Sequence, residues 1–164
     1  MHPEARAYVA SVIGGTAYPL VIEIGGRNIN GTIRDLVPHD TWTSIDLHDG
    51  PDVDEVVDAR HWYPPYLADL VVCCEVLEHS PDPEGIVKAA VSFLAPAGRL
   101  IITCAGPGRE PHSTVDGTPH LREGEWYENI EPDLLYGWLA PDLRDLMVAY
   151  DPAACDVRAT GVLR

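Results

Sequence analysis

Two acidic residues lie near the ends of two short apolar runs, at a spacing that suits the binding of a nucleoside. The first run, Val21–Ile24, contains Glu23 and leads into Gly25 and Gly26, and the second run ends at Asp46, roughly 20 residues after Gly25. Nucleotide-binding α/β sheets place a ribose-holding acid at about this distance from a glycine loop. Glycine lets the backbone approach a ligand because it has no Cβ, and a carboxylate accepts hydrogen bonds from both ribose hydroxyls.

A second group of reactive side chains surrounds another apolar run. Glu78 and His79 follow the strongly apolar segment 69–74, and ligands of parallel sheets bind where the strands end. A histidine there can act as a base near neutral pH. The alternative, which is equally compatible with the sequence, is that Glu78 and His79 have a purely structural role. His112 and Tyr127 stand in a long polar segment, 105–129, which has the length of a lid.

We expect His112 and Tyr127 to face a substrate pocket, with His112 the better proton acceptor. The alternative is a mobile surface loop whose histidine has no role. No metal site is predicted, because the histidines lack His-x-x-x-His or His-Glu-x-x-His spacing. The four cysteines include no Cys-x-x-Cys pair, and three of them (Cys73, Cys74 and Cys104) lie in apolar runs, which favours buried free thiols.

Composition and charge exclude several classes of protein. The 164 residues carry 26 acids against 11 lysines and arginines, a net charge of −15, so no nucleic-acid partner is expected. No apolar run approaches the roughly 18 residues of a membrane span, and the N-terminal residues lack the pattern of a signal peptide. We therefore expect a cytoplasmic protein with no membrane association.

Alternating patterns predict an α/β fold in a single domain over residues 1–164. Asp82 has the features of a helix N-cap, with a proline at the first helical position. The last two strands are too close in sequence for a crossover helix and should form an antiparallel hairpin. We expect strands at 20–24, 41–47, 55–58, 69–74, 99–104, 146–150 and 157–163, and helices at 3–13, 32–37, 83–94 and about 134–139.

Taken together, these segments resemble the class I S-adenosylmethionine-dependent methyltransferases along nearly the whole chain. The stretch 21–28 is similar to their first motif, Asp46 to their ribose acid, and 56–59 to their adenine-side motif. The stretch 68–79 is similar to the fourth-strand motif, and 94–101 to the Leu-x-Pro-Gly-Gly-x-Leu entry into the fifth strand. The resemblance implies a Rossmann-like, seven-stranded, mostly parallel sheet with a C-terminal antiparallel hairpin and helices on both faces.

The resemblance also implies S-adenosylmethionine as cofactor, and residues that hold it. One departure concerns the first motif, where Arg27 and Ile29 replace two glycines. Arg27 either pairs with the cofactor carboxylate or is a solvated loop arginine. Asp58 either binds the cofactor or only caps Arg60. The predicted cofactor-binding residues are Glu23, Gly25, Gly26, Arg27, Asp46, Leu47, Asp58, Ala59 and Cys74, with His112 and His79 as catalytic and Glu78 and Tyr127 as substrate-pocket residues.

The activity implied is methyl transfer to an oxygen or nitrogen of a small molecule. The alternatives are a non-catalytic methyltransferase-like module that binds the cofactor or a protein, and a methyltransferase of RNA, protein or a lipid-linked sugar. DNA methylation is disfavoured, because Pro64 and Pro65 precede the fourth strand rather than follow it. A nicotinamide enzyme is disfavoured by the absence of Gly-x-Gly-x-x-Gly. Acceptor recognition must come from the loops or from a second subunit, as in a homodimer.

Overall fold

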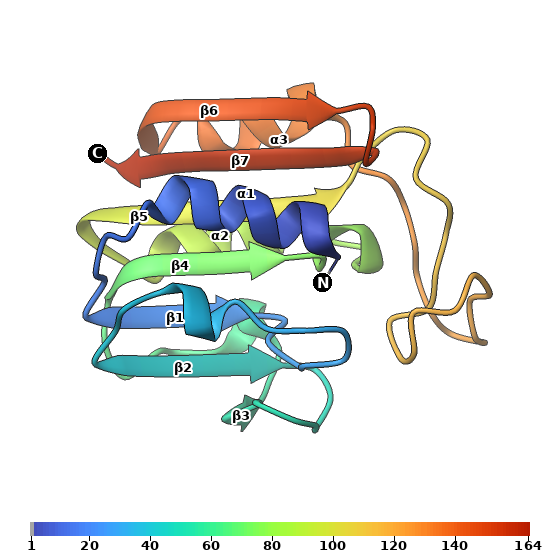
Figure 1. The fold of residues 1–164 in the computed structure, drawn as a ribbon, viewed down its shortest axis with the longest axis horizontal. Helices are drawn as coiled ribbons and strands as arrows, with labels where there is room; N and C mark the ends of the chain where they lie inside the picture. The colour runs from blue at the N-terminus through green and yellow to red at the C-terminus, as the bar shows by residue number, and fades with distance from the viewer. Residues whose placement is uncertain (1) are drawn as a thin grey trace.

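Seven strands form one sheet in the order β3-β2-β1-β4-β5-β7-β6 in the computed structural model, which describes residues 2–164 (Figure 1). The pairs β1–β2, β1–β4, β2–β3 and β4–β5 are parallel, and β7 runs antiparallel to both β5 and β6. The predicted hairpin and the mostly parallel sheet are therefore confirmed. The strands are β1 Leu20–Ile24, β2 Thr41–Asp46, β3 Glu55–Val56, β4 Ala68–Cys74, β5 Leu94–Ala105, β6 Leu143–Asp151 and β7 Asp156–Leu163.

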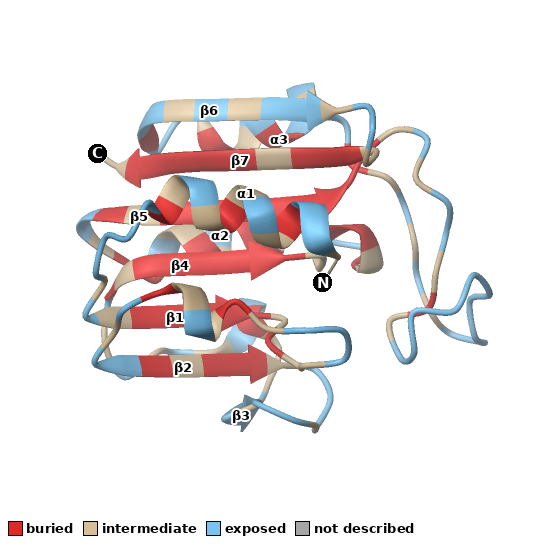
Figure 2. Cartoon of the chain, in the orientation of Figure 1, coloured by how far each residue is buried: buried red, intermediate tan, exposed pale blue. Residues whose placement is uncertain are grey.

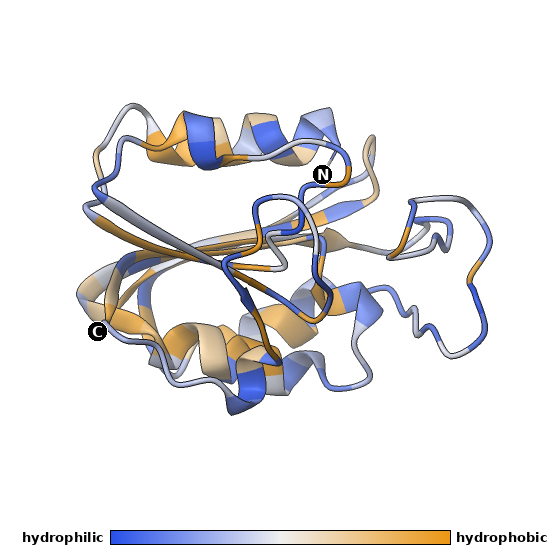
Figure 3. Ribbon diagram, turned by 90° about the horizontal axis from the view of Figure 1, so that it is seen from below, coloured by the Kyte–Doolittle hydropathy of each residue, from blue (hydrophilic) through white to orange (hydrophobic). Residues whose placement is uncertain are grey.

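Helices cover both faces of the sheet, as Figure 3 shows in a view along its edge. One face carries α1 (Pro3–Ile13), and the other carries α2 (Pro83–Ser92) and α3 (Pro132–Leu139). Short 3-10 turns complete the chain: η1 (Arg34–Leu36), η2 (Ala59–His61) and η3 (Leu77–His79). In the part of the chain described, no helix is both long and apolar enough to cross a membrane.

Each central strand contributes to two hydrophobic cores, because successive side chains point to opposite faces. Leu70 and Val72 of β4 pack with Val9 and Ile13 of α1, whereas Val71 packs in the core that contains α2 and α3. Figure 2 shows the result, with β4, β5 and β7 buried along most of their length. Burial on both faces explains why these strands read as continuous apolar runs in the sequence.

The helix α2 begins where the sequence predicts. The Asp82 carboxylate accepts a hydrogen bond from the Gly85 N–H at 3.0 Å, and Pro83 occupies the first turn. The helix ends earlier than expected, at Ser92, because Leu94 already pairs with Ala68 in the sheet. The prediction of Leu94 as a helical residue was therefore wrong, although the side chain is buried.

Two further segments are shorter than predicted. The expected helix at 32–37 is only the 3-10 turn η1, in which no residue is buried. The expected strand at 55–58 is only β3, an edge strand whose two residues are exposed. Ile33 and Val37 flank η1 and are buried in the core that contains α1, so this segment packs without forming a longer helix. The segment 106–131 leaves the carboxyl end of β5 and projects beyond the sheet edge before α3 (Figure 1).

Candidate functional site

A cavity of about 780 Å³ lies at the carboxyl ends of β1, β2 and β4. This edge includes the point where the strand order reverses between β1 and β4, which is where open α/β sheets bind ligands. Gly25, Arg27, Asp46, Leu47, Asp58, Ala59 and Cys74 all line the cavity, so the fold brings together most of the residues predicted to hold a cofactor. Glu23 and Gly26 lie outside the lining.

Asp46 ends β2 with its carboxylate held in place by backbone. One oxygen accepts a hydrogen bond from the His48 N–H at 2.9 Å, and the other accepts one from the Arg27 N–H at 3.3 Å. The first of these bonds is the turn contact typical of aspartate at the end of a strand. A carboxylate has about four acceptor sites, and therefore lone pairs remain for the two hydroxyls of a ribose.

The two glycines after β1 are needed for close packing. Gly25 has a φ of +76°, and a Cβ at this position would lie 2.1 Å from Cγ2 of Val76. A Cβ on Gly26 would lie 1.7 Å from the Ser44 Oγ. Gly25 therefore shapes the cavity directly, whereas Gly26 lets the loop approach β2 from behind the lining.

Glu23 is buried behind the cavity. Its carboxylate accepts a hydrogen bond from the Trp42 indole N–H at 3.0 Å. Burial raises the pKa of Glu23 to about 7, against the opposing effect of the Trp42 bond. This placement agrees with a carboxylate that braces the loop and connects β1 to β2.

Asp58 and Arg27 each have protein partners at the cavity wall. Asp58 caps η2 and accepts hydrogen bonds from the Arg60 N–H and guanidinium, which hold its pKa at about 2. The Arg27 guanidinium donates to the carbonyl oxygens of Thr114 and Val115 at 2.9 and 3.2 Å. Arg27 therefore connects the loop after β1 to segment 106–131.

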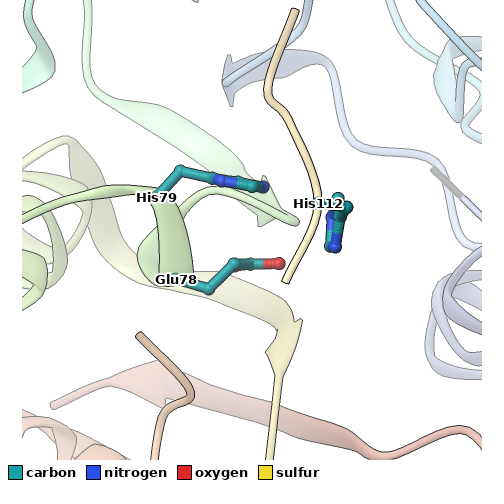
Figure 4. A group of neighbouring side chains, drawn as sticks. All are labelled: Glu78, His79 and His112. Atoms are coloured by element: carbon teal, nitrogen blue, oxygen red, sulfur yellow. The ribbon is translucent and has the colours of Figure 1, made fainter. Parts of the chain in front are cut away.

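The residues predicted to act on a substrate meet at the opposite wall of the cavity, where His79 and His112 line it and Glu78 and Tyr127 lie outside the lining. The rings of His79 and His112 meet edge to face at 4.9 Å between centroids, and Tyr127 lies 5.3 Å from His79 and 5.1 Å from His112. Figure 4 shows Glu78 and His79 extending from η3 toward His112. Residues from two distant parts of the sequence thus form one cluster.

Several polar atoms of this cluster lack hydrogen-bond partners among residues 2–164. They are both carboxylate oxygens of Glu78, Nδ1 of His79 and the hydroxyl of Tyr127. Burial is the main cause that raises the pKa of Glu78 well above its usual range, and the negative charge of the nearby Glu75 raises it further. Burial and the neighbouring His112 lower the pKa of His79 to about 4. The cluster therefore has unused capacity to bind a polar ligand.

Glu75 is a cavity residue that the sequence reasoning missed. It follows β4 directly with a φ of +57°, and its carboxylate accepts a hydrogen bond from the Thr103 hydroxyl at 2.9 Å. His2 Nε2 lies 3.2 Å from Glu75 and 3.1 Å from Asp156. Burial opposes protonation of His2, but the bonds to Asp156 and Glu75 outweigh it and raise its pKa to about 10. The acid at the strand end was a usable signal for Glu75, whereas nothing local indicated His2.

Glu125 is a second missed residue, and it organises segment 106–131. Its carboxylate accepts hydrogen bonds from the Ser113 hydroxyl at 2.8 Å, from the N–H and hydroxyl of Thr114 at 3.0 and 2.9 Å, and from the Arg122 N–H at 2.6 Å. These bonds join both sides of the loop. Glu125, Ser113 and Thr114 also line the cavity.

Comparisons with known proteins agree with this architecture. A family described as "Methyltransferase domain" matches residues 51–102. The ubiquinone biosynthesis O-methyltransferase of Pectobacterium carotovorum subsp. carotovorum (strain PC1) is 39% identical over 51 residues, which are 31% of this chain and 21% of that protein. The enzyme of the same name from Escherichia coli O9:H4 (strain HS) is 25% identical over 85% of this chain and 68% of its own length. The chain thus spans only part of these relatives.

Solved structures extend the similarity to the whole fold. The N-methyltransferase NodS from Bradyrhizobium japonicum WM9, in complex with S-adenosyl-L-homocysteine, superposes with a TM-score of 0.67. The alignment covers 98% of this chain and 85% of NodS at 18% identity, a level at which the likeness concerns the fold alone. The chain therefore has the fold of these S-adenosylmethionine-dependent methyltransferases, and its segment 51–102 matches the methyltransferase domain family.

Proposed function

We propose that the chain is an S-adenosylmethionine-dependent methyltransferase that acts on an oxygen or nitrogen of a small molecule. The observation that carries this proposal is the two-sided cavity, which has Asp46 on one wall and His79 and His112 on the other, with Tyr127 packed against both histidines. The relatives named O-methyltransferase and N-methyltransferase support the reaction class.

The donor side of the cavity fits an adenosyl group. Asp46 is placed to accept hydrogen bonds from ribose hydroxyls, and Gly25 keeps the adjacent wall open. Apolar side chains that can flank an adenine ring line the cavity beside Asp58, namely Ile45, Leu47, Val57, Ala59 and Ile86. The bound cofactor would supply a methyl group already activated by its sulfonium.

The acceptor side must align the acceptor and, where the acceptor is protonated, remove a proton. Alignment of two reactants provides a large part of the rate of such transfers. His112 lines the cavity on the loop, and His79 lines it at the base, so either imidazole can accept a proton from a bound hydroxyl or amine. We assign this task to His112, with Tyr127 and the buried Glu78 as its neighbours behind the cavity lining. A cytoplasmic location and a second subunit remain predictions of the sequence.

Product detection by mass spectrometry tests the proposal. The chain is incubated with S-adenosylmethionine bearing a deuterated methyl group and a panel of phenols, catechols, carboxylic acids and amines. A labelled product, formed together with S-adenosylhomocysteine, is expected for at least one class of acceptor. Binding of the cofactor without a product from any small acceptor would contradict the proposal and favour a non-catalytic module or a macromolecular acceptor.

A further inference from the structure

Glu78, His79 and His112 place one carboxylate and two imidazoles around a common point (Figure 4). Each offers a ligand atom, and these atoms all lie within 4.8 Å of one another. We propose that these three residues bind a divalent transition-metal ion such as zinc or iron. The spacing of the residues does not predict this site, because two ligands are neighbours on η3 and the third lies in a loop more than 30 residues later.

The state of Glu78 is the first argument for a cation. The residue is fully buried, and neither carboxylate oxygen has a hydrogen-bond partner among residues 2–164. Buried charges in proteins are paired or coordinate metals, because an isolated buried carboxylate is very unfavourable. The Glu78 carboxylate points toward His112 in Figure 4, so a cation bound between them would satisfy it.

The choice of ligand atoms is the second argument. Imidazole nitrogens suit zinc, copper, iron and nickel, whereas magnesium, calcium and manganese prefer sites made of oxygen atoms. Three protein ligands with an open position are typical of catalytic rather than structural zinc sites. Zinc stands roughly 2.0–2.2 Å from such ligands, so binding would draw His112 and its loop closer to η3.

A second cluster provides a contrast. His2, Glu75 and Asp156 also lie close enough to share an ion. Their charges, however, already pair with one another, and Asp156 also accepts a hydrogen bond from Arg109 at 2.9 Å. These groups need no further cation. The difference between the clusters is that Glu78 lacks a partner.

The metal site has a consequence for catalysis that rests on the proposed function. His79 and His112 line the cavity, so an open position on the ion is available to an acceptor. A bound metal ion would lower the pKa of a coordinated hydroxyl, so that the acceptor could release its proton to solvent without His112 as the base. The site thus favours hydroxyl acceptors over amines.

Metal titration of the free chain tests the site without any methyl transfer. The chain is stripped with a chelator, dialysed, and titrated with zinc chloride by calorimetry and with cobalt chloride by visible absorption. We expect one ion per chain, and at least about a 10-fold loss of affinity in both Glu78→Gln and His112→Ala. His120→Ala is the matched control, because His120 is exposed in the same loop and lies outside the cluster.

Wild-type affinity for zinc in both Glu78→Gln and His112→Ala, or no stoichiometric binding by the wild-type chain, would overturn the site. Circular dichroism checks that each variant folds, and His112→Ala keeps the test valid if the buried Glu78 substitution does not. Titration of the same samples with S-adenosylhomocysteine reports separately on the proposed function. Loss of metal binding with cofactor binding intact, or the reverse, therefore distinguishes the two failures.

Discussion

The two walls of the cavity differ in how far the protein satisfies its own polar groups. On the donor side, Asp46 and Asp58 accept hydrogen bonds from backbone and arginine groups at the ends of the sheet. On the acceptor side, polar atoms of Glu78, His79 and Tyr127 lack partners among residues 2–164, and segment 106–131 contributes His112 to the cavity lining. The polar groups of the donor side are thus held in place by the protein itself, whereas those of the acceptor side need a bound ligand as their hydrogen-bond or metal partner.

The largest difference between the effects on turnover and on cofactor affinity is expected for His112→Ala. Turnover should fall by roughly 10²-fold or more while affinity for S-adenosylhomocysteine stays unchanged, because His112 belongs only to the acceptor wall. Steady-state kinetics and calorimetry on one preparation measure both quantities, with His120→Ala as control. Turnover within a few-fold of the wild type would remove His112 from the site and leave His79 or simple alignment as the source of rate.

Glu78→Gln distinguishes the two roles open to His112. Glu78 is fully buried and cannot reach the acceptor proton itself, so a mechanism that uses only a histidine base should retain most of its turnover in this variant. A metal-dependent mechanism should lose turnover by roughly 10-fold or more. Kinetics in the presence and absence of added zinc provide the measurement.

Asp46→Ala should produce the opposite pattern to His112→Ala. Loss of hydrogen bonds to a charged group is expected to weaken S-adenosylhomocysteine binding by about 1.5–3 kcal/mol, and Asp46→Asn should lose less. Calorimetry measures the affinity, and thermal unfolding without ligand controls for damage to the turn at His48. Unchanged affinity in a folded Asp46→Ala protein would contradict the assignment of the donor wall.

Glu23→Gln tests the support behind the donor wall through its pH dependence. The folded chain holds the pKa of Glu23 at about 7, above its usual 4.5, so the free energy of unfolding should fall as pH rises through this window. The glutamine of this variant cannot ionise, so the variant does not lose this free energy of unfolding as pH rises. The difference in the free energy of unfolding, variant minus wild type, should therefore increase by on the order of 2 kcal/mol between pH 5 and pH 8. A difference that does not change with pH would contradict the burial argument.

The smallest effect is expected for Glu125→Gln, which weakens the organisation of the loop without removing a reacting group. Amide hydrogens in residues 113–125 should exchange several-fold faster, because the bonds that join Ser113, Thr114 and Arg122 lose a charged acceptor. Exchange in β1 and β4 should not change. Hydrogen exchange with mass spectrometry makes the measurement, and equal protection in the loop would show that Glu125 does not organise it.

The sequence predicted the donor wall better than the acceptor wall for a physical reason. The strands at β1, β2 and β4 are dictated by apolar runs, and the parallel sheet then brings Gly25, Asp46 and Cys74 to one edge. Asp82 and the proline after it likewise determined the start of α2. These are local signals that tertiary packing preserves.

The remaining features depend on contacts between distant residues. The sequence placed His112 and Tyr127 on a loop but could not show that their rings meet His79. Nothing near His2 indicates its pairing with Glu75 and Asp156, and nothing near Arg27 indicates its bonds to Thr114 and Val115. Even the departure of Leu94 from the predicted helix follows from its pairing with Ala68.

Calorimetry with S-adenosylhomocysteine and with NAD is the most direct test of the central claim, that the cavity beside Asp46 holds an adenosyl cofactor of the methyltransferase type. We predict binding of S-adenosylhomocysteine at about micromolar strength or better, with one site per chain and little binding of NAD, because the chain lacks the glycine-rich loop that holds a pyrophosphate. A preference for NAD, or no binding of S-adenosylhomocysteine by the folded chain, would contradict the account.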